Sequence, residues 1–317
     1  MPKAVNRRKF FRNSALSFAG IMLGSKMLSC KMDEIPPKAN SPSASYNIMK
    51  EVMTYRKISA HEHVGISKWI PIEEQIDIAD RLGIEKQVIS FPIVTGSGKM
   101  GTPEEFRDCN NVVLKAMKQN PDRYLGSCFV NPVYGKESLE EIKRCMDQGM
   151  IGLKVYNQVK LNDPLFYPII EKFIDLNMII LMHAVCGIGF GGHRTKYGNR
   201  QPEASIPEDF VDAAKRYPEA MFQYAHTGGG GDWEYACKAI QDFPNIYVDT
   251  SGSNNCGNMI DYALKYLGEE RLFFGTDGSY YQGVGTILAS NLNEAQKKKI
   301  FFENFNNILR KAGNHVN

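Results

Sequence analysis

The strongest constraint on the fold of this chain is a regular alternation of two kinds of segment that begins at Arg56. Short runs rich in β-branched and aromatic residues are typical of buried strands, and longer amphipathic segments are typical of helices. The pattern predicts strands over residues 57–61, 86–91, 124–130, 151–156, 178–183, 221–226, 245–249 and 271–276. The fold must therefore contain eight strands and the helical segments that connect them.

Each predicted strand is followed by a segment with helical character. These segments are residues 72–82, 103–119, 138–148, 164–176, 207–216, 233–242, 259–267 and 293–311. Eight strand–helix units predict a fold of the α/β class, the (β/α)8 TIM barrel. An open doubly wound sheet is the alternative, but the Gly-x-Gly-x-x-Gly loop usual after its first strand is absent from the sequence.

The first 30 residues differ from the rest and are predicted to be an export signal. Residues 6–12 hold Arg7 and Arg8 in a pattern that resembles the bacterial twin-arginine motif, and a short apolar run follows. Residues 27–30 resemble a lipoprotein cleavage box, which predicts a lipid anchor on Cys30. An ordinary cleaved signal without that anchor is the alternative. The protein is therefore expected to be periplasmic or a membrane-anchored lipoprotein.

The segment after the signal is rich in Pro, Ser, Lys and Asn, and residues 31–50 are predicted to be a flexible tether. The remainder, residues 51–317, is predicted to be a single domain. Twin-arginine export carries folded proteins, which suits a chain that loads its cofactor before export.

Charge and cysteine content exclude several classes of function. The net charge of +3 arises in the first 29 residues, and the rest of the chain carries 32 basic and 35 acidic residues. This balance gives no support for nucleic-acid binding. The seven cysteines include no Cys-x-x-Cys pair, so zinc-ribbon and thioredoxin-type functions are disfavoured. A small-molecule substrate is the expected partner, and an oligomer is compatible with the sequence.

Titratable residues gather where the predicted strands end. His61 and His63 lie one residue apart at the end of the first strand, so their side chains share a face. His183 ends the fifth strand, His226 ends the sixth, and Asp277 follows the eighth. Catalytic groups of such barrels collect at the C-terminal ends of strands, and the first and eighth strands are neighbours. This set predicts a metal site, because imidazole and carboxylate are ligands of zinc and similar ions.

This set, with the ending Gly275-Thr276-Asp277, resembles the amidohydrolase superfamily, and most closely its branch related to metal-dependent decarboxylases and lactonases. The resemblance runs from about Arg56 to Arg310. It implies a divalent metal, most often zinc with manganese possible. The implied ligands are His61, His63, His183 and Asp277, with His226 near the metal or just outside its ligand set. Ser59 stands where relatives often carry an aspartate.

Lys154 leaves the number of metal ions open. It lies in the fourth strand, where dihydroorotase and phosphotriesterase relatives carry a carboxylated lysine that bridges two ions. The alternative is an unmodified lysine in the barrel mouth, paired with a carboxylate. The ligand rules fit one ion or two.

The groups together predict metal-assisted hydrolysis of a small, anionic ester, lactone or amide. In this mechanism the metal activates a water molecule, Asp277 transfers the proton, and His226 polarises the carbonyl. Arg194 and His193, in the Gly-rich segment after the fifth strand, are candidate substrate-binding residues, although a solvated loop is the alternative. Tyr156 shares the inward face of Lys154 and is a third candidate.

Two other functions remain open from the sequence. Non-oxidative decarboxylation of a carboxylic acid uses the same ligands in the same branch, and its product would include carbon dioxide. A surface lipoprotein that uses an inactive barrel to bind a partner is a further alternative. Such a protein could tolerate the loss of metal ligands, yet every expected ligand is present in this chain.

Overall fold

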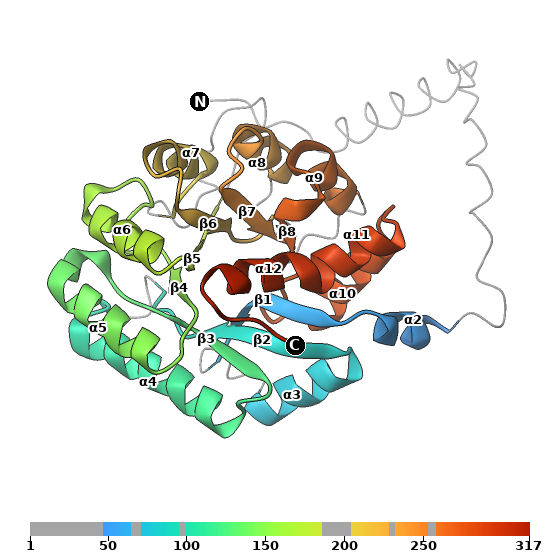
Figure 1. The fold of residues 1–317 in the computed structure, drawn as a ribbon, viewed down its shortest axis with the longest axis horizontal. Helices are drawn as coiled ribbons and strands as arrows, with labels where there is room; N and C mark the ends of the chain where they lie inside the picture. Colours follow the sequence, from blue (N-terminus) through green and yellow to red (C-terminus); the bar gives the residue numbers. More distant parts are fainter. Residues whose placement is uncertain (1–46, 65–70, 95–98, 186–203, 228–231, 253–257) are drawn as a thin grey trace, which may run out of the picture. The chain divides into compact units, whose positions relative to one another are not determined.

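The computed structural model describes residues 47–317 except 65–70, 95–98, 186–203, 228–231 and 253–257. Its centre is a sheet of eight parallel strands in sequence order (Figure 1). The strands are β1 (Lys57–His63), β2 (Ile84–Ser90), β3 (Tyr124–Cys128), β4 (Gly152–Val155), β5 (Ile179–Met182), β6 (Met221–Tyr224), β7 (Ile246–Asp249) and β8 (Leu272–Phe273). The predicted (β/α)8 barrel is thus confirmed. The predicted signal, the lipid anchor and most of the tether lie outside the described residues.

The barrel closes between its first and last strands. The backbone N–H of Ala60 donates to the carbonyl of Phe274 at 2.8 Å, and the N–H of Thr276 donates to that of His61 at 3.2 Å. The strand predicted over residues 271–276 is therefore longer than β8, since its second half pairs irregularly with β1 beyond the regular ladder. β1 itself runs two residues further than predicted and includes His63.

Helices surround the strands, and several match their predicted bounds. α4 (Pro103–Gln119), α7 (Pro207–Arg216) and α9 (Met259–Leu267) begin and end where the sequence pattern places them. The start of α4 is a capping box in which Thr102 and Glu105 each accept from the other's backbone N–H, and this arrangement satisfies amides that no helical partner reaches. The remaining helices that follow strands are α3 (Ile72–Arg81), α5 (Gly135–Asp147), α6 (Tyr167–Asp175) and α8 (Trp233–Ile240).

Two helices of the described residues were not predicted, and the last predicted helix is divided in the structure. α2 (Ile48–Thr54) precedes the barrel, and α10 (Tyr280–Ala289) follows β8. The final helix is interrupted, because α11 (Glu294–Lys298) and α12 (Asn304–Lys311) are separated by the π-helical turn Lys299–Glu303. The carbonyl of Ile300 in this turn accepts a hydrogen bond from the backbone N–H of Phe274 at 2.9 Å, which joins the C-terminal helix to β8.

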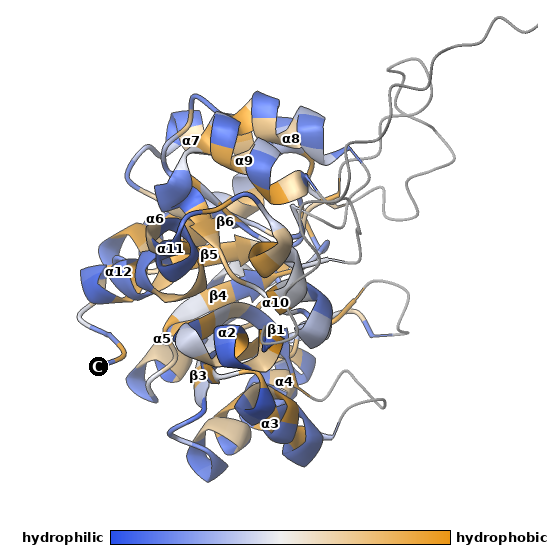
Figure 2. Cartoon of the chain, turned by 90° about the vertical axis from the view of Figure 1, so that its right-hand side faces the viewer, coloured by the Kyte–Doolittle hydropathy of each residue, from blue (hydrophilic) through white to orange (hydrophobic). Residues whose placement is uncertain are grey.

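One end of the barrel is apolar and is covered by the C-terminal helix. Figure 1 shows α12 lying across the ring of strands. Residues from the strand starts pack there against the helix in one buried cluster that includes Ile58, Val88, Ile151, Ile179, Met221, Phe273, Phe302 and Phe305. A second cluster fills the space between the strands and the outer helices, whose outward surfaces are hydrophilic (Figure 2). The histidines that end or follow the strands lie at the opposite, C-terminal end of the barrel.

Among the described helices, none combines the length and the apolar character that a bilayer-spanning segment needs.

Candidate active site

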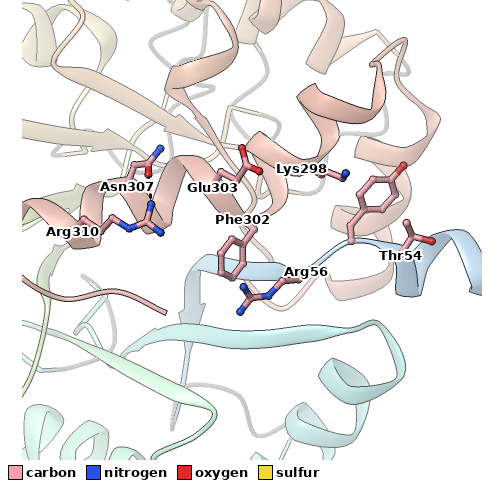
Figure 3. Close-up of a pocket in the computed structure, with 8 residues that line it drawn as sticks. Thr54, Arg56, Lys298, Phe302, Glu303, Asn307 and Arg310 are labelled. Atoms are coloured by element: carbon pink, nitrogen blue, oxygen red, sulfur yellow. Dashed lines mark hydrogen bonds between the residues drawn. The ribbon is translucent and has the colours of Figure 1, made fainter. Parts of the chain in front are cut away.

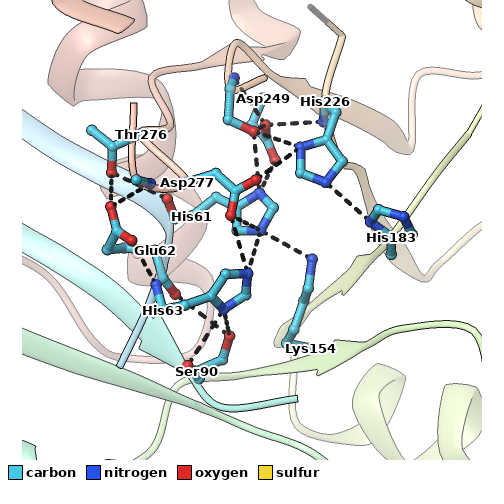
Figure 4. A network of polar contacts seen from close by, with 12 residues as sticks. His61, Glu62, His63, Ser90, Lys154, His183, His226, Asp249, Thr276 and Asp277 are labelled. Atoms are coloured by element: carbon cyan, nitrogen blue, oxygen red, sulfur yellow. Dashed lines mark hydrogen bonds and ion pairs between the residues drawn. The ribbon is translucent and has the colours of Figure 1, made fainter. Parts of the chain in front are cut away.

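The two histidines of β1 point into the C-terminal end of the barrel. The Nε2 atoms of His61 and His63 lie 3.3 Å apart, and the side chain of His61 is fully buried (Figure 4). His63 is anchored from the other side, since its Nδ1 lies 2.9 Å from the Oγ of Ser90 on β2. The shared face that the sequence predicts for these two side chains is present in the structure.

Asp277 reaches the same point from the turn after β8. Its carboxylate oxygens lie 3.2 Å from His63 Nε2, 3.7 Å from His61 Nε2 and 3.4 Å from His226 Nδ1. Asp277 has a φ of 44° and His226 a φ of 64°, both in the left-handed region that costs a residue with a side chain about 1–3 kcal/mol. Two such residues in one site indicate that the surrounding structure holds them for function.

His183 lies beside His226 and less close to the carboxylate. Its Nδ1 is 3.0 Å from His226 Nε2, and the ring of Tyr156 stacks on it with 3.9 Å between centroids. His61, His226 and Asp277 each offer a ligand atom within 4.8 Å of those of the other two. The structure thus groups His226 with His61 and Asp277, although the resemblance implies His183 as the ligand and His226 only near the metal, and His183 contacts the far nitrogen of the His226 ring.

Lys154 is fully buried among these residues. Its Nζ lies 3.0 Å from His61 Nε2, and burial lowers the pKa of its amine to about 8, although Asp277 and Asp249 act in the opposite direction. A substantial fraction of neutral amine at pH 8 is compatible with carboxylation of Lys154 and with an unmodified lysine.

Burial favours the neutral form of two imidazoles, those of His226 and His63, while the carboxylate stays charged. It lowers the pKa of His226 to about 4 and also lowers the pKa of His63. Burial alone would raise the pKa of Asp277, but electrostatic interaction with His61, the hydrogen bond from His63 and interaction with His226 bring it well below its usual range. Neutral imidazoles grouped around one carboxylate form a donor set that fits a divalent metal ion.

Sequence reasoning missed four buried polar residues that support this group: Glu62, Gln223, Asp249 and Ser251. Asp249 lies 3.1 Å from the Nδ1 of His61, across the ring from the Nε2 that faces His63. Burial raises the pKa of Asp249, but the interactions with His61 and His226 lower it by more, so the pKa lies below its usual range. The signal was present in the sequence, because Asp249 ends a predicted strand as His183 and His226 do.

Two candidate substrate-binding residues, Arg194 and His193, lie outside the described residues. Tyr156 is described, and its stacking on His183 places it beside the site as predicted from its shared face with Lys154. A cavity of about 550 Å³ opens elsewhere, between the start of β1 and the C-terminal helices (Figure 3). Its lining includes Arg56, Phe302 and Arg310 and none of the residues grouped around Asp277.

The chain is similar to proteins that share this barrel. It is 23% identical over 272 residues to 2-amino-3-carboxymuconate-6-semialdehyde decarboxylase of Dictyostelium discoideum, which covers 73% of this chain and 72% of that protein. The crystal structure of 2,6-dihydroxybenzoate decarboxylase from Rhizobium superposes with a TM-score of 0.64 at 17% identity, over 80% of this chain and 98% of that one.

A dihydroxybenzoic acid decarboxylase from Polaromonas sp. JS666, solved with manganese and the inhibitor 2-nitroresorcinol, gives a TM-score of 0.60 at 17% identity over 80% of this chain and 96% of that one. Likeness at this level of identity shows the fold. The family model described as Amidohydrolase matches residues 85–304, which is more than half of the sequence. The chain therefore belongs to the amidohydrolase family.

Proposed function

We propose that this protein is a metal-dependent decarboxylase of a small carboxylic acid. The observation that carries the proposal is the carboxylate of Asp277, which lies within 3.4 Å of both His63 and His226 at the mouth of an amidohydrolase barrel. The names of the similar proteins support decarboxylation more than the hydrolysis predicted from the sequence. Membership of an enzyme family also argues against a purely binding role.

His61, His63, His183 and Asp277 are the residues proposed to hold the metal, with His226 beside them. When bound, a divalent ion supplies positive charge that orients the acid and stabilises negative charge as it develops. Zinc and manganese both suit imidazole with carboxylate, and manganese is the ion in one similar structure.

The reaction replaces a carboxyl group by hydrogen. The bond between the substrate carbon and its carboxylate breaks, its electron pair stays on that carbon, and carbon dioxide leaves. A proton from solvent must then reach the carbon, and Asp277 is placed to relay it, because its carboxylate is partly exposed and faces His226 at 3.4 Å. Tyr156, stacked on His183, offers an aromatic wall for a planar acid. Arg194 and His193 remain candidates for the substrate carboxylate.

The experiment is a product assay on the metal-loaded full chain. 2,6-Dihydroxybenzoate and other hydroxybenzoates labelled with ¹³C in the carboxyl group are compared with a panel of esters, lactones and amides. Release of labelled carbon dioxide, lost on chelation and restored by zinc or manganese, supports the proposal. Hydrolysis of a panel member without carbon dioxide release from any acid contradicts it and favours the hydrolase alternative.

We also propose that the chain is exported and anchored through Cys30, as the N-terminal motifs predict. Mass spectrometry of the processed protein from bacterial membranes tests this directly. A lipid-modified Cys30 at the N-terminus supports the anchor, and a processed protein that begins elsewhere contradicts it. Cys30→Ser is expected to release the protein from the membrane fraction.

A further inference from the structure

We propose that Asp249, acting with Ser251, fixes which ring nitrogen carries the proton in His61, His226 and His183. Asp249 is a positioning residue in this proposal, and it decides which histidine lone pairs are available to a metal ion. The inference rests on the metal site proposed above. Asp249 and Ser251 are both buried, so water does not compete for their hydrogen bonds. Figure 4 shows Asp249 beside His61 and His226.

One oxygen of the Asp249 carboxylate determines the tautomer of His61. This Oδ2 lies 3.1 Å from His61 Nδ1 and accepts from Gln223 Nε2 at 2.9 Å. A carboxylate can only accept, so His61 must carry its proton on Nδ1 and keep a lone pair on Nε2. Lys154 agrees with this assignment, because its Nζ is a donor and lies 3.0 Å from His61 Nε2.

The other oxygen determines the tautomer of His226 through Ser251. This Oδ1 accepts from the Ser251 hydroxyl at 2.5 Å and from the backbone N–H groups of Ser251 at 3.1 Å and His226 at 3.2 Å. With its only hydrogen committed to Asp249, the Ser251 oxygen can only accept, and the ring nitrogens that face it are His226 Nδ1 at 3.0 Å and His61 Nδ1 at 3.3 Å. His226 therefore carries its proton on Nδ1, and the Asp277 carboxylate, 3.4 Å from the same nitrogen, favours the same tautomer.

The chain of contacts continues to His183. The Nε2 of His226 now holds a lone pair and lies 3.0 Å from His183 Nδ1, so His183 donates and is protonated on Nδ1. His61 and His183 are left with lone pairs on Nε2, the state that a metal ligand needs. The Nδ1 of His226, which lies 3.4 Å from the Asp277 carboxylate, keeps a proton and acts as a donor. One buried carboxylate thus separates the two kinds of histidine.

The substitution Asp249→Asn is expected to change the tautomer of His61 but not that of His226. The backbone N–H groups of Ser251 and His226 cannot reverse, so the amide oxygen must stay toward them and the amide NH₂ must face His61. The Nδ1 of His61 then has to accept, and its proton moves to Nε2. Ser251 still donates to the amide oxygen, so His226 keeps its tautomer. Ser251→Ala acts on the other ring, because it removes the nearer acceptor of His226 Nδ1, keeps Asp277 at 3.4 Å from that nitrogen, and leaves the contact between Asp249 and His61.

The test is nitrogen NMR of the metal-free full chain labelled with ¹⁵N-histidine, at pH 8, where ordinary imidazole with a pKa of about 6.5 is neutral. Protonated and lone-pair ring nitrogens resonate in separate regions. In the unsubstituted protein, His61, His226 and His183 are expected to show the proton on Nδ1. Asp249→Asn should switch His61 alone. Ser251→Ala should keep the His61 tautomer and shift the Nδ1 resonance of His226, which loses its nearer acceptor and keeps Asp277.

Ser90→Ala is the matched control, since Ser90 contacts only His63 among these rings and should leave the other three spectra unchanged. A proton on Nε2 of His61 in the unsubstituted protein overturns the proposal, and so does an unchanged His61 spectrum in a folded Asp249→Asn variant. The same variant is expected to bind zinc 10- to 100-fold more weakly. Because the spectra need neither metal nor substrate, failure of decarboxylation leaves this result intact.

Discussion

The carboxylate of Glu62 accepts a hydrogen bond from the backbone N–H of Gly278 at 3.0 Å and so fastens the turn that carries Asp277 to β1. The same carboxylate accepts from the Thr276 hydroxyl at 2.6 Å and from the N–H of His63 at 2.8 Å. Glu62 lies between His61 and His63 in β1, but its side chain points to the opposite face of the strand from theirs. Burial raises the pKa of Glu62, and these donors offset part of that rise.

Glu62→Gln should loosen this connection, because one amide cannot accept from all three donors. We expect the free energy of unfolding to fall by about 1–3 kcal/mol, the cost of leaving a buried donor without a partner. Urea unfolding measures this loss, and a metal titration should show weaker binding. Glu140→Gln, at an exposed glutamate 3.9 Å from Lys136, is the control and should change stability by less than about 0.5 kcal/mol. Equal effects of the two substitutions would contradict the assignment.

The fold was predictable because the strand pattern, the helix caps and the count of eight units agree with one another. The pattern could not show the π-helical turn Lys299–Glu303. In this turn the carbonyl of Ile300 accepts a hydrogen bond from Phe274, a residue that comes close to it only after the chain has folded. α10 was missed because Gly283 and Gly285 interrupt its helical pattern, and both residues have low helix propensity.

The convergence of His61, His63 and Asp277 could be predicted from strand ends alone, because barrel closure makes β1 and β8 neighbours. The support beneath them could not. Asp249 ends a predicted strand, but whether a carboxylate there faces a histidine or the solvent depends on side-chain direction and on which strand lies opposite. Ser251 carries no signal in the sequence, since serine after a strand is ordinary turn composition.

Asp277→Asn should abolish turnover while the fold stays intact. The amide retains the size of the side chain but can neither take up a proton nor carry the negative charge that the three surrounding histidines stabilise. A loss of at least 10²-fold in kcat is expected from removing a proton-transfer group. Circular dichroism and thermal unfolding check the fold alongside the product assay. Turnover within tenfold of the unsubstituted protein would remove Asp277 from the proton-transfer role.

Acid should destabilise the metal-free protein at a pH well above the range where carboxylates titrate. The pKa of His226 is about 4 in the folded protein and near 6.5 in the unfolded chain, so between these values the unfolded state binds more protons. The free energy of unfolding therefore falls as the pH is lowered from 6.5 to 4, by up to about 3 kcal/mol for this residue. The lowered pKa of His63 acts in the same direction.

Urea unfolding of the metal-free protein at pH 7, 6 and 5 measures this slope. His226→Gln should flatten it, because the group that titrates differently in the two states is gone. His315→Gln, at an exposed histidine near the C-terminus, is the matched control and should keep the slope of the unsubstituted protein. If His226→Gln and His315→Gln show the same slope, burial of His226 is not its source.

Two glycines of α10 should respond in opposite directions to the same substitution. A Cβ atom on Gly283 would meet the carbonyl oxygen of Gly275 at 3.2 Å and the ring of Phe274 at 3.3 Å, whereas one on Gly285 would meet nothing within 4 Å. Gly283→Ala should therefore lower the free energy of unfolding by about 1–3 kcal/mol through overpacking. Gly285→Ala should raise it by about 0.5–1 kcal/mol through helix propensity.

The difference between these variants also reports on the site, because Gly275 itself lies close to Asp249 and His61. A Cβ on Gly275 would lie 3.2 Å from the Cβ of Asp249 and 3.3 Å from that of His61, so little space separates β8 from these two residues. The added methyl group of Gly283→Ala would push on the Gly275 carbonyl and so displace Gly275 toward Asp249 and His61. We therefore expect Gly283→Ala to weaken metal binding as well as stability, while Gly285→Ala leaves the titration unchanged. Equal metal affinity in both variants would show that α10 packs on β8 without constraining the histidines.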